Sequence, residues 1–97
     1  MLEELFGSKN RERVLQFILA SNEGYAKEIA DFYDSSVDPI QKQLERLELG
    51  SILVTKKVGR TRLFMFNPRY AFRKELEALL LKAREYYAPH EIERLTK

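Results

Sequence analysis

Residues 36–68 read SVDPIQKQLERLELGSILVTKKVGRTRLFMFNP, and the spacing of the apolar side chains changes at Gly50. Before Gly50, apolar residues recur at intervals of four and three, which is the spacing of one helical face. These residues are Ile40, Leu44 and Leu47. Ser36 is of a type that caps helices. The sequence therefore predicts a helix over residues 36–49.

After Gly50 the apolar period becomes two, as in a half-buried strand. Ile52, Val54 and Val58 share one face of the first extended run, and Arg62, Phe64 and Phe66 alternate with Leu63 and Met65 in the second. Gly59 lies between the two runs and can supply the turn. The sequence thus predicts a hairpin over residues 52–66, closed by Asn67-Pro68.

Caps, turn residues and apolar spacing predict three further helices. One is capped by Ser8 and ends near residues 22–24, a second covers residues 25–33, and the last covers residues 70–87 and ends at Pro89. The eight residues after Pro89 are too few to assign.

The predicted order is helix, helix, turn, helix, hairpin, helix, which is the order of a winged helix-turn-helix. We therefore expect a mainly α fold with a small β-hairpin, built from a three-helix core, a wing and a C-terminal helix. A chain of 97 residues with 44% apolar side chains has enough material for one modest core. A single domain over residues 1–97 is expected.

Charge is sorted along the chain. No acidic side chain occurs between Leu49 and Lys74, although the whole chain carries 17 basic and 15 acidic residues. The basic residues of this segment are Lys56, Lys57, Arg60, Arg62, Arg69, Arg73 and Lys74. Such a segment gives one surface a positive potential that attracts a polyanion, so nucleic acid is the first candidate partner.

Several functional classes are disfavoured by the composition. The chain has no cysteine and a single histidine, His90, which leaves no disulfide framework and no thiolate metal site. It also lacks a signal-peptide pattern and any membrane-spanning apolar run. No nucleophile triad, P-loop or glycine-rich fingerprint occurs. We expect a cytoplasmic protein that is not an enzyme and uses no cofactor or metal.

Residues 28–50 resemble the paired helices of ArsR-like bacterial and archaeal transcription regulators. Residues 54–62, followed by Asn67-Pro68, resemble the basic wing of that family and the entry to its last helix. The resemblance covers roughly residues 5–85. It implies a homodimeric regulator, in this case a repressor, that binds double-stranded DNA.

Residues 5–8 and 67–82 are most similar to a subgroup in which the winged helix lies beside, or is fused to, a nucleotidyltransferase domain. The chain also departs from the family, because Asp34-Ser35 replaces the usual Gly-Leu of the inter-helix turn. The metal sensors of the family use cysteine, histidine and carboxylate clusters. Metal sensing is therefore not implied here.

Helix 36–49 is predicted to enter the major groove, because its side opposite the apolar face is polar. Its predicted DNA-contacting residues are Ser36, Val37, Asp38, Gln41, Lys42, Glu45 and Arg46. Gln41 and Lys42 are the predicted base readers, since Gln can bond adenine and Lys can bond guanine. The alternative is that these side chains are merely solvated.

Hairpin 52–66 is predicted to lie on the minor groove and the DNA backbone. Arg60 and Arg62 are the expected minor-groove or phosphate ligands, while Lys56 and Lys57 neutralise the backbone. The alternative is a hairpin edge that charge protects from aggregation. Edge protection does not require charges of one sign, and this favours the DNA interpretation.

The C-terminal helix, at about residues 69–88, is predicted to form the dimer interface. Its apolar residues keep a heptad spacing and are Phe72, Leu76, Leu79, Ala83 and Tyr86. We expect Leu80 to pack inward, while Leu79 and Ala83 face the partner. Purely intramolecular packing is the alternative. A second functional class also stays open, namely an interaction module that docks a partner such as a nucleotidyltransferase.

Overall fold

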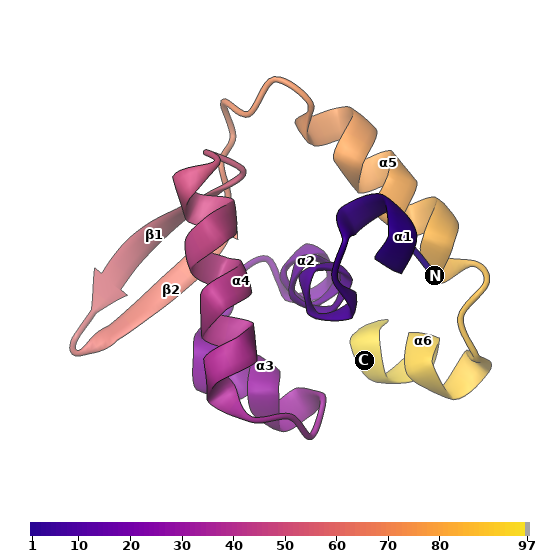
Figure 1. Cartoon of the computed structure of the whole chain (residues 1–97), viewed down its shortest axis with the longest axis horizontal. Helices are drawn as coiled ribbons and strands as arrows, with labels where there is room; N and C mark the ends of the chain where they lie inside the picture. Colours follow the sequence, from indigo (N-terminus) through magenta and orange to yellow (C-terminus); the bar gives the residue numbers. More distant parts are fainter. Residues whose placement is uncertain (97) are drawn as a thin grey trace.

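The computed structural model describes residues 1–96, which form six helices and one two-stranded sheet (Figure 1). The elements are α1 (Glu3–Phe6), α2 (Lys9–Ser21), α3 (Ala26–Phe32), α4 (Val37–Leu49), β1 (Leu53–Val58), β2 (Thr61–Phe66), α5 (Arg73–Arg84) and α6 (Pro89–Thr96). The predicted mainly α fold with a small hairpin is confirmed. No helix in the described part of the chain is long and apolar enough to span a membrane.

Helix α2 lies in the centre of the molecule, with α3, α4 and the hairpin on one side and α5 and α6 on the other (Figure 1). The buried core draws on every one of these elements except α6, and its fully buried members include Val14, Ile18, Ile29, Ile40, Leu44, Leu53, Phe64 and Leu80. The apolar face predicted for helix 36–49 is confirmed, because Ile40, Leu44 and Leu47 are all buried.

The two predicted helix caps behave differently. The Ser8 hydroxyl accepts a hydrogen bond of 3.2 Å from the Arg11 N–H and so caps α2 as expected. Ser36 occupies the cap position of α4, but its side chain makes no capping hydrogen bond. Asp34, in the turn before it, has a φ of 55°. Asp tolerates this left-handed conformation better than most residues, so the turn forms without the usual glycine.

The hairpin pairs β1 and β2 in antiparallel register, with Leu53 opposite Phe66 and Thr55 opposite Phe64. Leu53, Phe64 and Phe66 are buried and define the face that packs on the core. The face predicted for the first strand was therefore wrong, because Val54 lies on the other face. Residues 52–54 are all apolar, so alternation alone could not decide which face is buried.

The base of the hairpin is attached to the core by Gly24. Its N–H and C=O exchange hydrogen bonds of 3.0 and 2.8 Å with the backbone of Phe64. A Cβ at this position would lie 2.9 Å from the Phe17 ring. Only glycine lets the backbone approach this closely, so this position fixes where the wing leaves the core.

The C-terminal region differs from the prediction. Helix α5 begins at Arg73 and ends at Arg84, so it is shorter than predicted, and a further helix, α6, begins at Pro89. Proline is favoured in the first turn of a helix as well as after its end, and the sequence pattern could not distinguish the two. The short helix α1 was not predicted either.

Candidate nucleic-acid interface

Helix α4 and the hairpin lie next to each other on one side of the molecule (Figure 1). Of the residues predicted to contact DNA from α4, Ser36, Asp38, Lys42 and Glu45 are exposed, and Gln41 is partly exposed. These five side chains are therefore available to a partner. They are compatible with a recognition helix in the major groove.

Two predicted contact residues of α4 lie elsewhere. Val37 is partly buried and packs against the hydrophobic core, because it lies three residues before Ile40 on the same helical face. Arg46 is exposed, but it lines a hollow with Phe6 and Tyr70, on the flank of α4 that faces α1 and the loop before α5. The expectation that Val37 projects outward is therefore corrected, while the contact of the exposed Arg46 with DNA stays a prediction.

The outward face of α4 carries both signs of charge. Asp38 and Glu45 contribute two carboxylates and Lys42 one ammonium group, and Leu49 at the end of the helix is 88% exposed. The positive potential on this side of the molecule thus comes from the hairpin and not from α4. The outward face of α4 carries no excess of positive charge. Any contact of α4 with DNA therefore depends on hydrogen bonds to particular bases and not on general attraction to phosphates.

The hairpin presents four basic side chains to solvent. Lys56, Lys57, Arg60 and Arg62 are exposed, and Arg60 lies in the turn beside Gly59, whose φ of 62° allows the tight reversal. Lys57 pairs with Arg62 across the strands, while Lys56 points to the opposite face. The wing can therefore contact phosphates along both of its faces and at its tip.

Arg62 has a different environment from the other basic residues of the wing. Its Nη2 donates a hydrogen bond of 2.5 Å to Oε1 of Glu48, and the Thr55 hydroxyl donates one of 2.8 Å to Oε2 of the same carboxylate. The Arg62 guanidinium also lies 5.2 Å from the centroid of the Phe64 ring. We call Glu48, Thr55 and Arg62 the wing clip. Arg62 is thus a partner of α4 within the chain, while its side chain stays 43% exposed, and its predicted role as a phosphate ligand stays a prediction.

Electrostatics agree with this geometry. The hydrogen bond from Thr55, together with the bond and charge of Arg62, lowers the pKa of the Glu48 carboxyl against the opposing effect of burial. The sequence pattern did not single out Glu48 or Thr55, because contact between the end of a helix and two strands is a tertiary feature. Their only sequence signal is that Glu48 immediately precedes a segment without acidic residues.

The apolar residues predicted for the dimer interface divide into two groups. Ala83 is only 4% exposed within one chain, and Leu76 packs against the core, so these two residues face inward. The prediction that Ala83 faces a partner is corrected. Phe72 and Tyr86 are 63% and 64% exposed, and Leu79 is partly exposed. Tyr86 lies just beyond the end of α5.

The contact between α5 and α2 contains buried polar groups that sequence reasoning missed. Gln16 is fully buried, and its Nε2 donates a hydrogen bond of 2.7 Å to the Leu80 carbonyl. Its Oε1 accepts hydrogen bonds from Nε and Nη2 of Arg84 at 3.2 and 3.0 Å. The Tyr87 hydroxyl donates to the buried carboxylate of Glu12. These bonds fix the orientation of α5 on the core.

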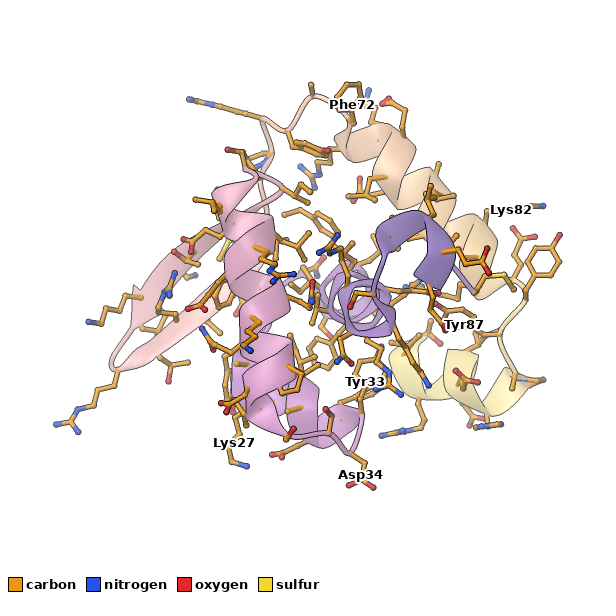
Figure 2. All side chains as sticks on the ribbon, viewed as in Figure 1. Lys27, Tyr33, Asp34, Phe72, Lys82 and Tyr87 are labelled. Atoms are coloured by element: carbon orange, nitrogen blue, oxygen red, sulfur yellow. The ribbon has the colours of Figure 1, made fainter. Side chains whose placement is uncertain are left out.

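A pocket of about 570 Å³ lies on the side of the molecule away from the hairpin, and Tyr33 and Tyr87 are among its lining residues (Figure 2). Burial raises the pKa of both phenols. The Arg94 guanidinium lies 4.3 Å from the Phe32 ring centroid and that of Arg13 lies 5.2 Å from the Tyr33 ring centroid. Two aromatic rings of the pocket, those of Phe32 and Tyr33, therefore already face arginines of the chain.

No group of three or more His, Asp and Glu side chains that could hold a metal ion occurs among residues 1–96. The absence of a metal site stays a prediction, as does the absence of enzymatic activity.

Solved structures with the same arrangement of helices and hairpin are winged-helix transcription regulators. HlyU from Vibrio cholerae aligns with a TM-score of 0.66 and 17% identity over 90% of this chain and 85% of its own. The fold is a winged helix. The adhesin competence repressor AdcR from Streptococcus pyogenes also gives a TM-score of 0.66, with 13% identity over 87% of this chain and 63% of AdcR.

A mutant of ZitR from Lactococcus lactis aligns with a TM-score of 0.57 and 14% identity over 88% of this chain and 66% of that chain. No protein-family model and no curated protein matches the sequence. At these identities the likeness concerns the winged-helix fold, and the function has to be argued from the side chains of the interface.

Proposed function

We propose that this chain is a sequence-specific DNA-binding transcription regulator, a repressor that acts as a homodimer in the cytoplasm. The observation that carries the proposal is the position of the exposed Lys56, Lys57 and Arg60, on a hairpin beside the outward face of α4. Next to the hairpin, α4 and its cap residue present four more exposed side chains and the partly exposed Gln41. The four are Ser36, Asp38, Lys42 and Glu45. This is the combination of a phosphate-binding wing and a base-reading helix.

The two parts of the interface have different tasks. The basic side chains of the wing neutralise phosphates and release counterions, which supplies affinity for any duplex. Gln41 and Lys42 supply sequence preference, because Gln can bond adenine through two hydrogen bonds and Lys can bond the acceptors of guanine. Asp38 and Glu45 repel phosphates and can accept only from bases such as cytosine, so they oppose binding to an arbitrary sequence.

Dimerisation is proposed through the exposed apolar surface of α5 and its two ends. Leu79 lies in α5 and is partly exposed, while Phe72 just before the helix and Tyr86 just after it are 63% and 64% exposed. Apolar surface of this kind outside the core suits a contact with a second copy of the chain. Two-fold pairing places two copies of α4 on half-sites about 10 base pairs apart.

The experiment is a selection of bound duplexes from a random DNA library, followed by measurement of affinity for selected and random duplexes. We expect enrichment of a palindromic sequence. Gln41→Ala should reduce the preference for one or two positions per half-site and leave affinity for random DNA nearly unchanged, since the phosphate contacts stay. Gln43→Ala is the matched control, because Gln43 accepts a hydrogen bond of 3.0 Å from Arg11 on another flank of α4. A selection that enriches nothing refutes the proposal.

The alternative function is a winged-helix interaction module. The observation that favours it is the surface of α4, which carries the carboxylates of Asp38 and Glu45 and ends in Leu49, a leucine that is 88% exposed. Exposed apolar side chains with mixed charge suit a protein surface better than DNA. The resemblance described above names a nucleotidyltransferase as the partner. Size-exclusion chromatography with a nucleotidyltransferase encoded by a neighbouring gene distinguishes the two functions, since only the module forms a stable complex.

A further inference from the structure

We propose that Glu48 is a positioning residue, which holds the wing at one angle to α4 through its bonds to Thr55 and Arg62. The proposal rests on the DNA-binding function proposed above. It assigns to the wing clip a role in sequence discrimination, although none of its three residues needs to contact a base.

The carboxylate of Glu48 joins three elements of the fold. Glu48 lies in the last turn of α4, Thr55 in β1 and Arg62 in β2. Each oxygen of the Glu48 carboxylate accepts a hydrogen bond from a different strand. Thr55 donates to Oε2 at 2.8 Å and Arg62 donates to Oε1 at 2.5 Å. A rotation of the hairpin about its long axis or away from α4 breaks at least one of these bonds. The clip therefore restrains both movements.

Through Arg62, the clip holds the hairpin nearer to its tip than the other attachments of the wing do. The other attachments of the wing are the buried side chains Leu53 and Phe66 and the backbone pair of Gly24 with Phe64, all at or near the base of the hairpin. The residues from Lys56 to Arg60 are exposed, and Figure 1 shows the tip of the hairpin projecting away from the helices. Arg62 lies nearer to the tip than these attachments, so the clip limits how far the tip moves.

Arg62 already has a partner for its charge within the chain. Its charge is matched by Glu48, and its guanidinium stacks over the ring of Phe64, which is buried in the core. A residue whose main task is to bind phosphate is expected to keep its charge free. Partly exposed ion pairs contribute little to folding stability. The Glu48–Arg62 pair therefore acts mainly on the orientation of the wing and contributes little to the free energy of unfolding.

The fixed angle matters because base reading by α4 and phosphate binding by the wing occur on the same duplex. If the wing is held, both contacts form together and no further ordering is needed at binding. If the wing can rotate relative to α4, it can still bind phosphates on any duplex. Its binding then no longer requires that α4 lies correctly in the major groove. Loss of the clip should thus lower discrimination more than it lowers affinity for random DNA.

The test compares Glu48→Ala with Glu93→Ala. Both variants remove one carboxylate from a helix, and Glu93 is exposed on α6, outside the proposed interface, and forms no hydrogen bond or ion pair with residues 1–96. Affinity is measured for a random duplex and for the duplex selected by the wild type. A change of net charge alone alters both affinities by the same factor and leaves their ratio unchanged. We expect the ratio of selected to random affinity to fall by about 3- to 10-fold in Glu48→Ala only, which is the cost of ordering one segment at an interface. Equal ratios in the two variants overturn the proposal.

A second variant leaves the charge of the chain unchanged. Thr55→Val removes one bond of the clip while keeping the shape of the side chain, so it should lower the same ratio by a smaller factor and leave the salt dependence of binding as it is. An unchanged ratio for Thr55→Val counts against the proposal in the same way, since a charge effect at Glu48 would then suffice.

A measurement without DNA separates the clip from the proposed function. Residual dipolar couplings of the free protein report the orientation of the hairpin amides relative to those of α4. In the wild type one alignment tensor should fit both, and in Glu48→Ala the hairpin couplings should be averaged. Couplings that are the same in both proteins refute the clip. A protein that enriches no DNA sequence but shows these couplings retains the clip and refutes the DNA-binding function instead.

Discussion

Replacing Arg60 with Ala tests whether the tip of the wing contacts DNA. Arg60 is exposed in the turn of the hairpin and, unlike Arg62, forms no ion pair among residues 1–96. Each phosphate neutralised contributes about −0.9 to the slope of log affinity against log salt. A dimer that loses this contact twice should show a slope less negative by about 1.8, which between about 50 and 200 mM salt corresponds to roughly a 12-fold change.

The assay is fluorescence anisotropy with a random-sequence duplex at several salt concentrations, because phosphate contacts do not depend on sequence. Lys82→Ala is the matched control, since Lys82 carries the same charge near the end of α5, far from the hairpin (Figure 2). The control should keep the wild-type slope. If the two variants have equal slopes, the tip of the wing does not contact DNA, and the charge sorting of the sequence has been misinterpreted.

Three further predictions concern the dimer, the core and the wing clip. Leu79→Asp should give a folded monomer in light scattering, because a charge buried at the seam is costly, while Leu81→Asp on the opposite flank of α5 should stay dimeric; a dimeric Leu79→Asp contradicts the interface. Gln16→Leu should lower the free energy of unfolding in urea by about 2 to 4 kcal/mol, since it leaves Arg84 without its acceptor; a loss below about 0.5 kcal/mol would be a surface-like effect and contradict the buried network. Because Thr55 and Arg62 lower the pKa of Glu48, the charged carboxylate stabilises the fold above its ordinary pKa, and this effect, small for a partly exposed pair, is lost as pH falls through the folded value; the urea midpoints of wild type and Glu48→Ala should therefore differ slightly at neutral pH and converge in acid, and a gap independent of pH would argue against the clip.

The elements that sequence reasoning located correctly are those with one apolar face. Helix α4 shows Ile40, Leu44 and Leu47 on one side and polar residues elsewhere, so its period is unambiguous. The face of β1 was predicted wrongly because residues 52–54 are apolar on both sides. Helix α6 was missed because Pro89 can end a helix as well as begin one.

Two features of the sequence predict the candidate site, namely the run without acidic residues and the spacing of apolar residues in α4. Together they indicate α4 and the hairpin, and the exposure of Lys42 and Arg60 is compatible with that prediction. Neither could indicate that Arg62 turns back onto Glu48, because 14 residues separate the two and their proximity results from the packing of the hairpin on α4. The burial of Ala83 is likewise a property of the packed core.

The contact of α6 with α3 has a mechanical consequence for operator length. Arg94 donates a hydrogen bond of 2.7 Å to the carbonyl of Phe32, and Leu95 is buried, so the segment after α5 is attached to the first helix of the helix-turn-helix. Gln16 attaches α5 itself to α2. In the proposed dimer, the distance between the two copies of α4 is then set by a rigid frame. Base pairs are spaced by about 3.4 Å, so in the proposed DNA-binding dimer a frame of this kind would fix the number of base pairs between the two half-sites.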